Sequence, residues 1–188
     1  MDPLRTRHVN RSSAEGFSLI EVIISTAILA TGLLTLAGFM GLGLRAMNGS
    51  KAVLTAREKA REAVESVHTA RDTGLLTWTK IQNVPAGGVF LAGAQALTIP
   101  GPDGLVNTAD DGGIEAIRTP GADGILGNSD DVQTPLSNFT REILITPLNQ
   151  DGTNIVNPNL RQITVNITYT VEGVTRTYTL TTYISSFS

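Results

Sequence analysis

The feature that most constrains this chain is an almost uncharged stretch near its N-terminus. Residues 17–44 are dominated by Leu, Ile, Ala and Gly, and their one charged residue is Glu21. As a helix with a rise of about 1.5 Å per residue, this stretch is about 42 Å long, which exceeds the roughly 30 Å hydrocarbon core of a bilayer. A membrane-inserted helix is therefore predicted. Because a carboxylate inside such a helix is destabilising, Glu21 is expected to have a partner or a function.

The residues before this stretch are polar and basic. Residues 1–16 carry three arginines against two acidic residues. An excess of Arg is retained in the cytoplasm, so the N-terminus is predicted to lie there and the C-terminal part on the other side of the membrane. A secretory signal peptide has a shorter apolar region, of about 7–15 residues, followed by a small-residue cleavage site. Here the small residue, Gly16, comes before the apolar stretch, which argues against such a signal peptide.

The junction between the two segments reads Gly16-Phe17-Ser-Leu-Ile-Glu21-Val. This motif resembles the class III leader of type IV prepilins and of the pseudopilins of type II secretion. The resemblance implies that a prepilin peptidase cuts after Gly16 and methylates the new amine of Phe17, and that Phe17 and Glu21 act in assembly. Residues 24–44 and the Ala-rich segment after them are most similar to minor pilins of the PilV type.

Four glycines interrupt the apolar stretch, namely Gly32, Gly38, Gly41 and Gly43. Each costs about 1 kcal/mol relative to Ala in a helix interior. Small residues let helices approach closely in membranes, which is one explanation. The resemblance to pilins supplies another, the unwinding of this section on filament assembly. Both interpretations stay open.

The helix is expected to continue beyond residue 44. Over residues 52–71, apolar side chains recur at spacings of three and four, which predicts an amphipathic helix with one buried face. They are Val53, Ala56, Ala60, Ala63, Val64 and Val67. Gly74 supplies a stop signal, so one helix is predicted over residues 17–73.

Strands are predicted in the C-terminal part. Residues 163–171 and 174–184 alternate between apolar residues and Thr or Asn around Glu172-Gly173, which predicts an antiparallel hairpin with one buried face. Residues 139–146 and 89–99 are further candidate strands. A sheet of three or four strands lying on the helix gives an α+β fold class, and the resemblance implies the pilin fold.

Together with the resemblance, which implies that residues 1–16 are a cleaved leader, this pattern divides the rest of the chain into a transmembrane half (17–44) and an amphipathic half (45–73) of the helix, and an exported β-rich domain (74–188). That last segment has 10 acidic and 5 basic residues, so no nucleic-acid partner is predicted. The chain has no Cys and 2 His, and no nucleophile or zinc motif is recognisable, so we expect no enzymatic activity.

An internal repeat lies within the exported segment. Residues 100–111 (PGPDGLVNTADD) recur as residues 120–131 (PGADGILGNSDD), with six of twelve positions identical. Calcium prefers six to eight oxygen ligands from flexible loops, so the repeated carboxylates are candidate ligands. They are Asp103, Asp110, Asp111, Asp123, Asp130 and Asp131. The alternative is a pair of solvated turns without a metal.

Together with these patterns, the resemblance implies a type IV pilus subunit of the minor kind, with a type II secretion pseudopilin as the alternative. A membrane-anchored, exported calcium-binding module is an alternative of another class. The expected partners are other pilin subunits, a prepilin peptidase, the assembly platform of a pilus or secretion system, and the bacterial inner membrane. The expected final location is a surface pilus or a periplasmic pseudopilus.

The calcium prediction is testable by melting. A bound ion stabilises the folded state by about 2.7 kcal/mol when calcium is present at about 100 times Kd. The fragment from Lys51 onward should therefore melt at a higher temperature in calcium than in chelator, while magnesium should substitute poorly. Replacing Asp110 and Asp111 with Asn should remove the difference. Equal melting temperatures in calcium and in chelator would favour solvated turns.

Overall fold

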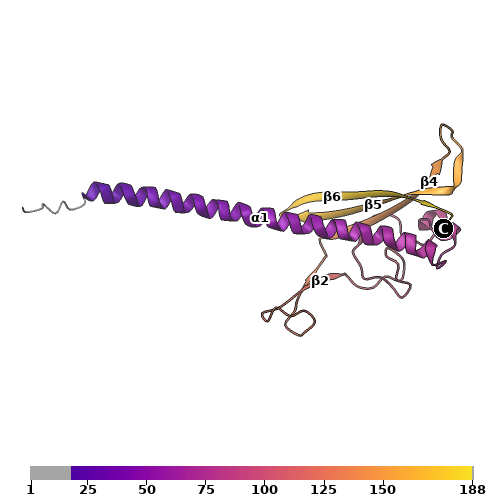
Figure 1. Ribbon diagram of the computed structural model, residues 1–188, viewed down its shortest axis with the longest axis horizontal. Coiled ribbons are helices and arrows are strands. Elements are labelled where there is room, and N and C mark those ends of the chain that lie inside the picture. The colour runs from indigo at the N-terminus through magenta and orange to yellow at the C-terminus, as the bar shows by residue number, and fades with distance from the viewer. Residues whose placement is uncertain (1–17, 188) are drawn as a thin grey trace, which may run out of the picture. The chain divides into compact units, whose positions relative to one another are not determined.

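The computed structural model describes residues 18–187 of the 188-residue chain. The chain divides into two compact units, Met1–Ala46 and Met47–Ser188. Helix α1 (Leu19–Asp72) is followed in the chain by an antiparallel sheet, so the predicted α+β fold class, with its long N-terminal helix, is confirmed (Figure 1).

The described part of the first unit is helical and has no internal core. Ser18 lies directly before the helix, and its carbonyl accepts hydrogen bonds from the N–H groups of Glu21 and Val22, at 3.0 and 3.2 Å. Large apolar side chains are exposed all around it, with Leu19 at 78% and Leu34 at 73% exposure. Such a helix is stable only where an apolar environment covers it.

In the second unit, α1 presents a face of small side chains. Five of them are fully buried, namely Ala56, Ala60, Ala63, Val67 and Ala70. Val64 is only partly buried, and Val53 is 39% exposed, so the predicted face is correct except at its first residue. The helix ends at Asp72, and the predicted stop residue Gly74 follows it, with a φ of +69° that suits glycine and an N–H that donates to the Arg71 carbonyl.

The main sheet has the strand order β1-β4-β5-β6. Its strands are β1 (Gln95–Ala96), β4 (Phe139–Asn149), β5 (Val156–Val171) and β6 (Val174–Ser185). The predicted hairpin is confirmed as β5–β6. It turns at Glu172 and Gly173, which both have positive φ, as the turn of a two-residue hairpin requires.

The strand proposed for residues 89–99 is wrong except for the two residues of β1. The reason is that the side chain of Asn83 occupies the edge of β4. Its amide nitrogen donates to the Ile143 carbonyl at 2.7 Å, and its oxygen accepts from the Ile145 N–H at 2.9 Å. Because one side chain satisfies the backbone there, no further strand is needed.

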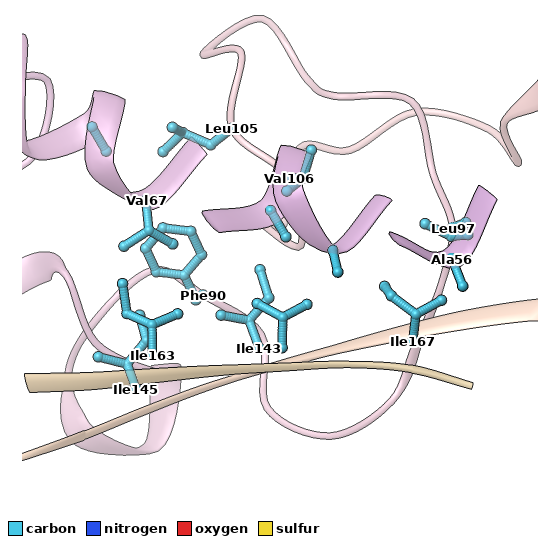
Figure 2. Close-up of a cluster of buried hydrophobic side chains, with 14 of the residues drawn as sticks. Ala56, Val67, Phe90, Leu97, Leu105, Val106, Ile143, Ile145, Ile163 and Ile167 are labelled. Atoms are coloured by element: carbon cyan, nitrogen blue, oxygen red, sulfur yellow. The ribbon is translucent and has the colours of Figure 1, made fainter. Parts of the chain in front are cut away.

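The core lies between the sheet and the small-residue face of α1 (Figure 2). From the sheet come Ile143, Ile163, Val165 and Ile167, all fully buried. The loop segments add Phe90, Leu97, Leu105 and Val106. The core is thus mainly aliphatic, in a chain whose aromatic content is 5%. One aromatic pair, Phe139 and Tyr169, stacks at 5.4 Å.

A second, two-stranded ribbon was not predicted. Strands β2 (Ala116–Thr119) and β3 (Val132–Pro135) pair with each other and not with the main sheet. They enclose the second copy of the repeat, residues 120–131. We call the ribbon with this loop, residues 116–135, the arm.

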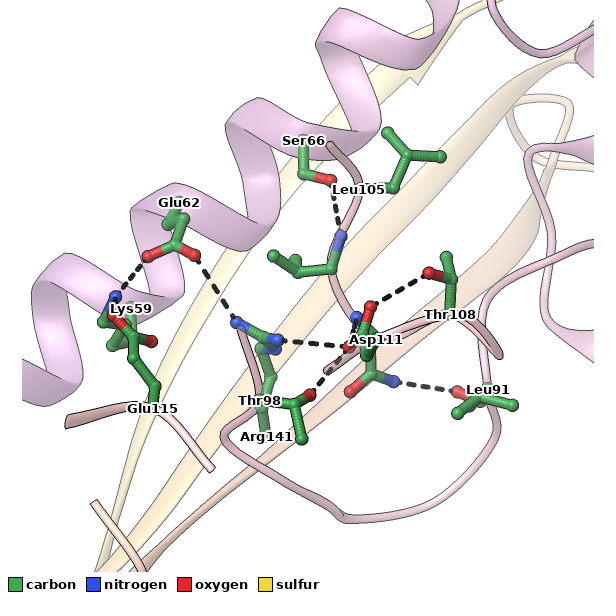
Figure 3. A network of polar contacts seen from close by, with 12 residues as sticks. Lys59, Glu62, Ser66, Leu91, Thr98, Leu105, Thr108, Asp111, Glu115 and Arg141 are labelled. Atoms are coloured by element: carbon green, nitrogen blue, oxygen red, sulfur yellow. Dashed lines mark hydrogen bonds and ion pairs between the residues drawn. The ribbon is translucent and has the colours of Figure 1, made fainter. Parts of the chain in front are cut away.

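A buried cation joins helix, loop and sheet. Arg141 of β4 is fully buried, and its guanidinium lies 3.9 Å from Glu62 of α1 and 4.0 Å from Asp111 (Figure 3). Burial lowers the pKa of Arg141, and the nearby carboxylates oppose that shift. Next to it, Lys59 pairs with Glu62 and Glu115. Burial lowers the pKa of Lys59, but its hydrogen bonds to these carboxylates outweigh burial, so the net shift is upward.

Replacing Arg141 with Met should destabilise the second unit by about 3 kcal/mol, because removing one partner of a buried ion pair leaves a charge uncompensated. The matched control is Arg118→Met. Arg118 also lies 4.0 Å from an aspartate, Asp131, but its side chain is 53% exposed, so the loss should be about 1 kcal/mol at most. Urea denaturation of the fragment from Lys51 measures both, and equal losses would contradict the role of the buried pair.

Candidate functional sites

The first candidate site is the start of α1. Glu21 lies in the first turn of the helix and its side chain is exposed. Among residues 18–187, no side chain is in hydrogen-bond or ion-pair contact with its carboxylate. The predicted processing residues Gly16 and Phe17 lie outside the described residues.

Three threonine hydroxyl groups of the apolar stretch have hydrogen-bond partners within the helix. Thr26, Thr31 and Thr35 donate to backbone carbonyls three or four residues earlier, at 2.8–3.0 Å. In a hydrocarbon environment, polar groups need such internal partners. Within the described part of the chain, α1 is the one helix whose length and apolar composition suffice to cross a membrane.

The four glycines of the stretch face open space. A Cβ atom added at Gly32, Gly38, Gly41 or Gly43 would meet no atom within 4 Å. Nothing in the described part of this chain therefore explains the absence of side chains there. Close packing against another helix and unwinding both remain open as explanations.

The second candidate site is the acidic repeat, whose two copies have the same local structure. In each copy, the first aspartate accepts a hydrogen bond at 2.8 Å from the N–H two residues later; the pairs are Asp103 with Leu105 and Asp123 with Ile125. The glycine after that aspartate has a φ of +71° in both. These are Asx turns, as the solvated-turn interpretation describes.

The last aspartate of each copy closes the loop. It accepts from the N–H four residues earlier at 2.7–2.8 Å, and a guanidinium lies 4.0 Å away. The groups are Asn107, Asp111 and Arg141 in the first copy, and Gly127, Asp131 and Arg118 in the second. Asp111 also accepts from Thr98 and Thr108. Each loop is thus held by its own carboxylates.

The six candidate calcium ligands are divided between these two loops. Within residues 18–187, no group of three or more His, Cys, Asp or Glu side chains is arranged to hold a metal ion. The observed role of the carboxylates is to accept hydrogen bonds from the loop backbone and from neighbouring side chains. Calcium binding stays a prediction for the melting experiment to decide.

The copies differ in their surroundings, and sequence reasoning missed this difference. Leu105 and Val106 of the first copy are 2% and 1% exposed, whereas the aligned Ile125 and Leu126 are 63% and 58% exposed. Both copies carry two aliphatic residues at the same place in the loop, which indicates a position suited to burial. Composition alone does not tell which copy is buried.

Comparison with known protein families supports the resemblance seen at the Gly16–Phe17 junction. A family model described as the prokaryotic N-terminal methylation motif matches residues 11–37. No curated protein and no solved structure gave a significant match. The matched segment contains the Gly16–Phe17 junction, Glu21 and the start of α1. The chain thus carries the class III prepilin leader that characterises the type IV pilins and pseudopilins.

Proposed function

We propose that the chain is a structural subunit of a type IV pilus, of the minor kind. It is inserted in the bacterial inner membrane, processed by a prepilin peptidase and assembled through its N-terminal helix. The observation that carries this proposal is the methylation motif at residues 11–37, placed at the start of an apolar helix. The role is structural, and no catalytic step is assigned to the chain.

Processing changes the electrostatics of the helix start. Cleavage after Gly16 removes the basic leader and leaves an amine on Phe17, four residues before Glu21. That amine and the Glu21 carboxylate have opposite charges. In an apolar bundle, where water does not compensate either charge, their pairing offsets part of the desolvation cost. The Glu21 carboxylate is therefore needed for assembly into the filament and not for insertion into the membrane.

The exposed apolar surface of the first unit also supports assembly. Lipid covers this surface while the subunit is in the membrane. When the subunit leaves the bilayer, the same side chains need a new apolar environment, which the helices of neighbouring subunits provide. Gly32, Gly38, Gly41 and Gly43 leave room for such close neighbours.

A type II secretion pseudopilin would use the same leader and helix. The two functions differ in where the assembled protein is found, since a pilus is released from the cell surface by shearing and a pseudopilus stays in the periplasm. An anchored calcium-binding module would stay in the membrane fraction and would never join a filament.

Processing is tested by changing the cleavage junction. Gly16→Leu should block cleavage, because Gly16 is the small residue directly before the apolar stretch, and the product should keep residues 1–16. Mass spectrometry of the parent protein should find Phe17 as its first residue, with a methylated amine. A mature protein that begins at another residue would contradict the assignment.

The assembly role of Glu21 is tested by Glu21→Gln, which keeps the size of the side chain and removes its charge. Cleavage and membrane insertion should be normal, but recovery in sheared filaments should fall at least about tenfold, because an amine left unpaired in an apolar bundle costs several kcal/mol. Glu65→Gln is the matched control, since Glu65 is an exposed carboxylate on α1 outside the apolar stretch. Immunoblots of membrane and filament fractions measure both variants. Normal recovery of Glu21→Gln would show that its charge is not needed.

A further inference from the structure

Strand β6 forms a free edge of the main sheet (Figure 1). It pairs with β5 alone, and its register against β5 runs without a bulge from Val174 to Ser185. Natural proteins protect such edges with prolines, bulges, short strands or several charged residues. β6 has 12 residues, no proline and one charged residue, Arg176. Its edge is therefore long and unprotected.

The hairpin turn determines which backbone groups of β6 face outward. Val171 and Val174 flank a two-residue turn and exchange hydrogen bonds, so every second residue of β6 bonds to β5. The N–H and C=O groups of the residues between them point away from the sheet. Within residues 18–187, no other part of the chain forms hydrogen bonds with these outward groups. The residues are Thr175, Thr177, Thr179, Thr181 and Tyr183.

The two edges of the sheet differ in how they are covered. At the opposite edge, β1 and the side chain of Asn83 bond to the backbone of β4. Along β6, the one comparable contact from the described chain is at the end of the strand, where Arg71 of α1 donates to the Ser185 carbonyl at 3.0 Å. The edge thus accepts a hydrogen bond where a donor is within reach, and the rest of the strand lacks one.

A groove of about 360 Å³ lies between this edge and α1. A strand added to β6 would direct every second side chain into the groove and the others to the opposite face of the sheet. A cavity of about 150 Å³ accepts a benzene-sized group, so the groove has room for two such side chains. Its lining includes Arg57, Arg61, Val64 and Glu65 of the helix, and Tyr178 and Leu180 of the strand.

The charge along this groove is mainly positive. Arg57 and Arg61 are exposed, and no ion pair within the described part of the chain involves either of them. Arg176 is also exposed, and the two-residue period of β6 places it on the side of the groove. Glu65 is the one acidic residue in the lining, and Glu58 is not part of it. The groove therefore favours acidic side chains on an incoming strand.

The direction of β6 sets the order of side chains on that strand. β6 runs alongside α1 in the same direction, since the turn before it lies near Lys51 and its last residue contacts Arg71. Arg57 and Arg61 therefore lie toward the start of β6, and Val64 lies beyond them. An antiparallel strand, the more stable arrangement, would present apolar side chains first and acidic side chains after them.

We infer that β6 binds an extended, acidic strand of a different protein, which adds to the main sheet and fills the groove beside α1. Hydrogen bonds to the outward backbone groups supply affinity, and the groove selects the alternating side chains. The β6 strand of a second copy has no acidic residue, so it does not supply the charge that the groove favours. This contact goes beyond the proposed function, because it lies within the second unit and does not require a filament.

A synthetic peptide tests this edge directly. The probe Thr-Val-Thr-Val-Thr-Glu-Thr-Glu-Thr has its valines and glutamates on one face and its threonines on the other. Its binding to the full-length protein in detergent micelles is measured by fluorescence anisotropy of the labelled peptide. A matched peptide with Lys in place of Glu should bind at least about tenfold more weakly, because its charges repel the arginines.

Backbone methylation separates strand addition from other modes of binding. In the antiparallel arrangement, the N–H groups of the probe threonines face β6, and those of its valines and glutamates face away. A methyl group on the central threonine nitrogen should lower the affinity at least about tenfold, because it removes a hydrogen bond and separates the strands. A methyl group on the nitrogen of the preceding valine should leave the affinity close to that of the parent peptide.

Variants of the protein test the same contact from the other side. Thr179→Pro removes one outward N–H and should abolish binding, while circular dichroism should show an intact sheet, since proline is tolerated in edge strands. Arg61→Glu should lower the affinity at least about tenfold. Lys51→Glu is its matched control, because Lys51 is an exposed cation of α1 outside the groove, and this variant should bind like the parent. If Thr179→Pro does not fold, the methylated peptides and Arg61→Glu decide.

Three results would each overturn the inference. They are no binding of the probe at concentrations up to about 1 mM, equal affinities of the two methylated peptides, and equal affinities of Arg61→Glu and Lys51→Glu. A parent protein that is dimeric in micelles and becomes monomeric with Thr179→Pro would also overturn it, because a second copy would then cover the edge. Absence of the chain from sheared filaments would contradict the proposed function and not this contact.

Discussion

The second unit depends on how closely its sheet can approach α1. Four of the five fully buried residues on that face of the helix are alanines, and a fifth, Val67, is the largest. Because the alanine side chain occupies little volume, Ile143, Ile163 and Ile167 reach the helix surface and exclude water. With larger residues on this face, the sheet would stand further away and the loop with Leu105 and Val106 would have no place in the core.

The close approach of sheet and helix also buries the charge of Arg141 between them, which is unfavourable unless other contacts compensate for it. Arg141 has no hydrogen-bond partner for its three side-chain nitrogens, and its contacts to Glu62 and Asp111 are ion pairs at 3.9 and 4.0 Å. Replacing both partners of such a buried pair together by apolar residues is often neutral or stabilising, whereas removing one partner alone is destabilising. What it adds is orientation, because the one cation contacts the helix, the sheet and the loop of the first repeat. We attribute the position of that loop to this three-way contact together with the Ser66 hydrogen bond.

The sequence was a good guide wherever periodicity decides structure. The helix from Leu19, its small face and the hairpin of β5 and β6 follow from spacings of three, four and two residues, and the methylation motif led to the family of the leader. Residues 74–138 were harder to predict. There, single side chains pair with the backbone, Asn83 at the edge of β4 and Asp111 within its own loop, and hydrogen bonds of this kind leave no periodic signal. Lys59 and Glu115 are 56 residues apart in the chain, so no local sequence pattern indicates that their side chains pair.

The repeated loop has a consequence for how this chain tolerates change. Substitutions in the first copy alter a core and should unfold the protein, since Leu105, Val106 and Asn107 are all buried. The second copy keeps its shape by its own hydrogen bonds and contributes no residue to that core. A duplicated loop of this kind separates two tasks that one loop cannot perform together. The first copy preserves the fold. The side chains of the second copy are free to change, and so to form a new surface, while the core stays intact.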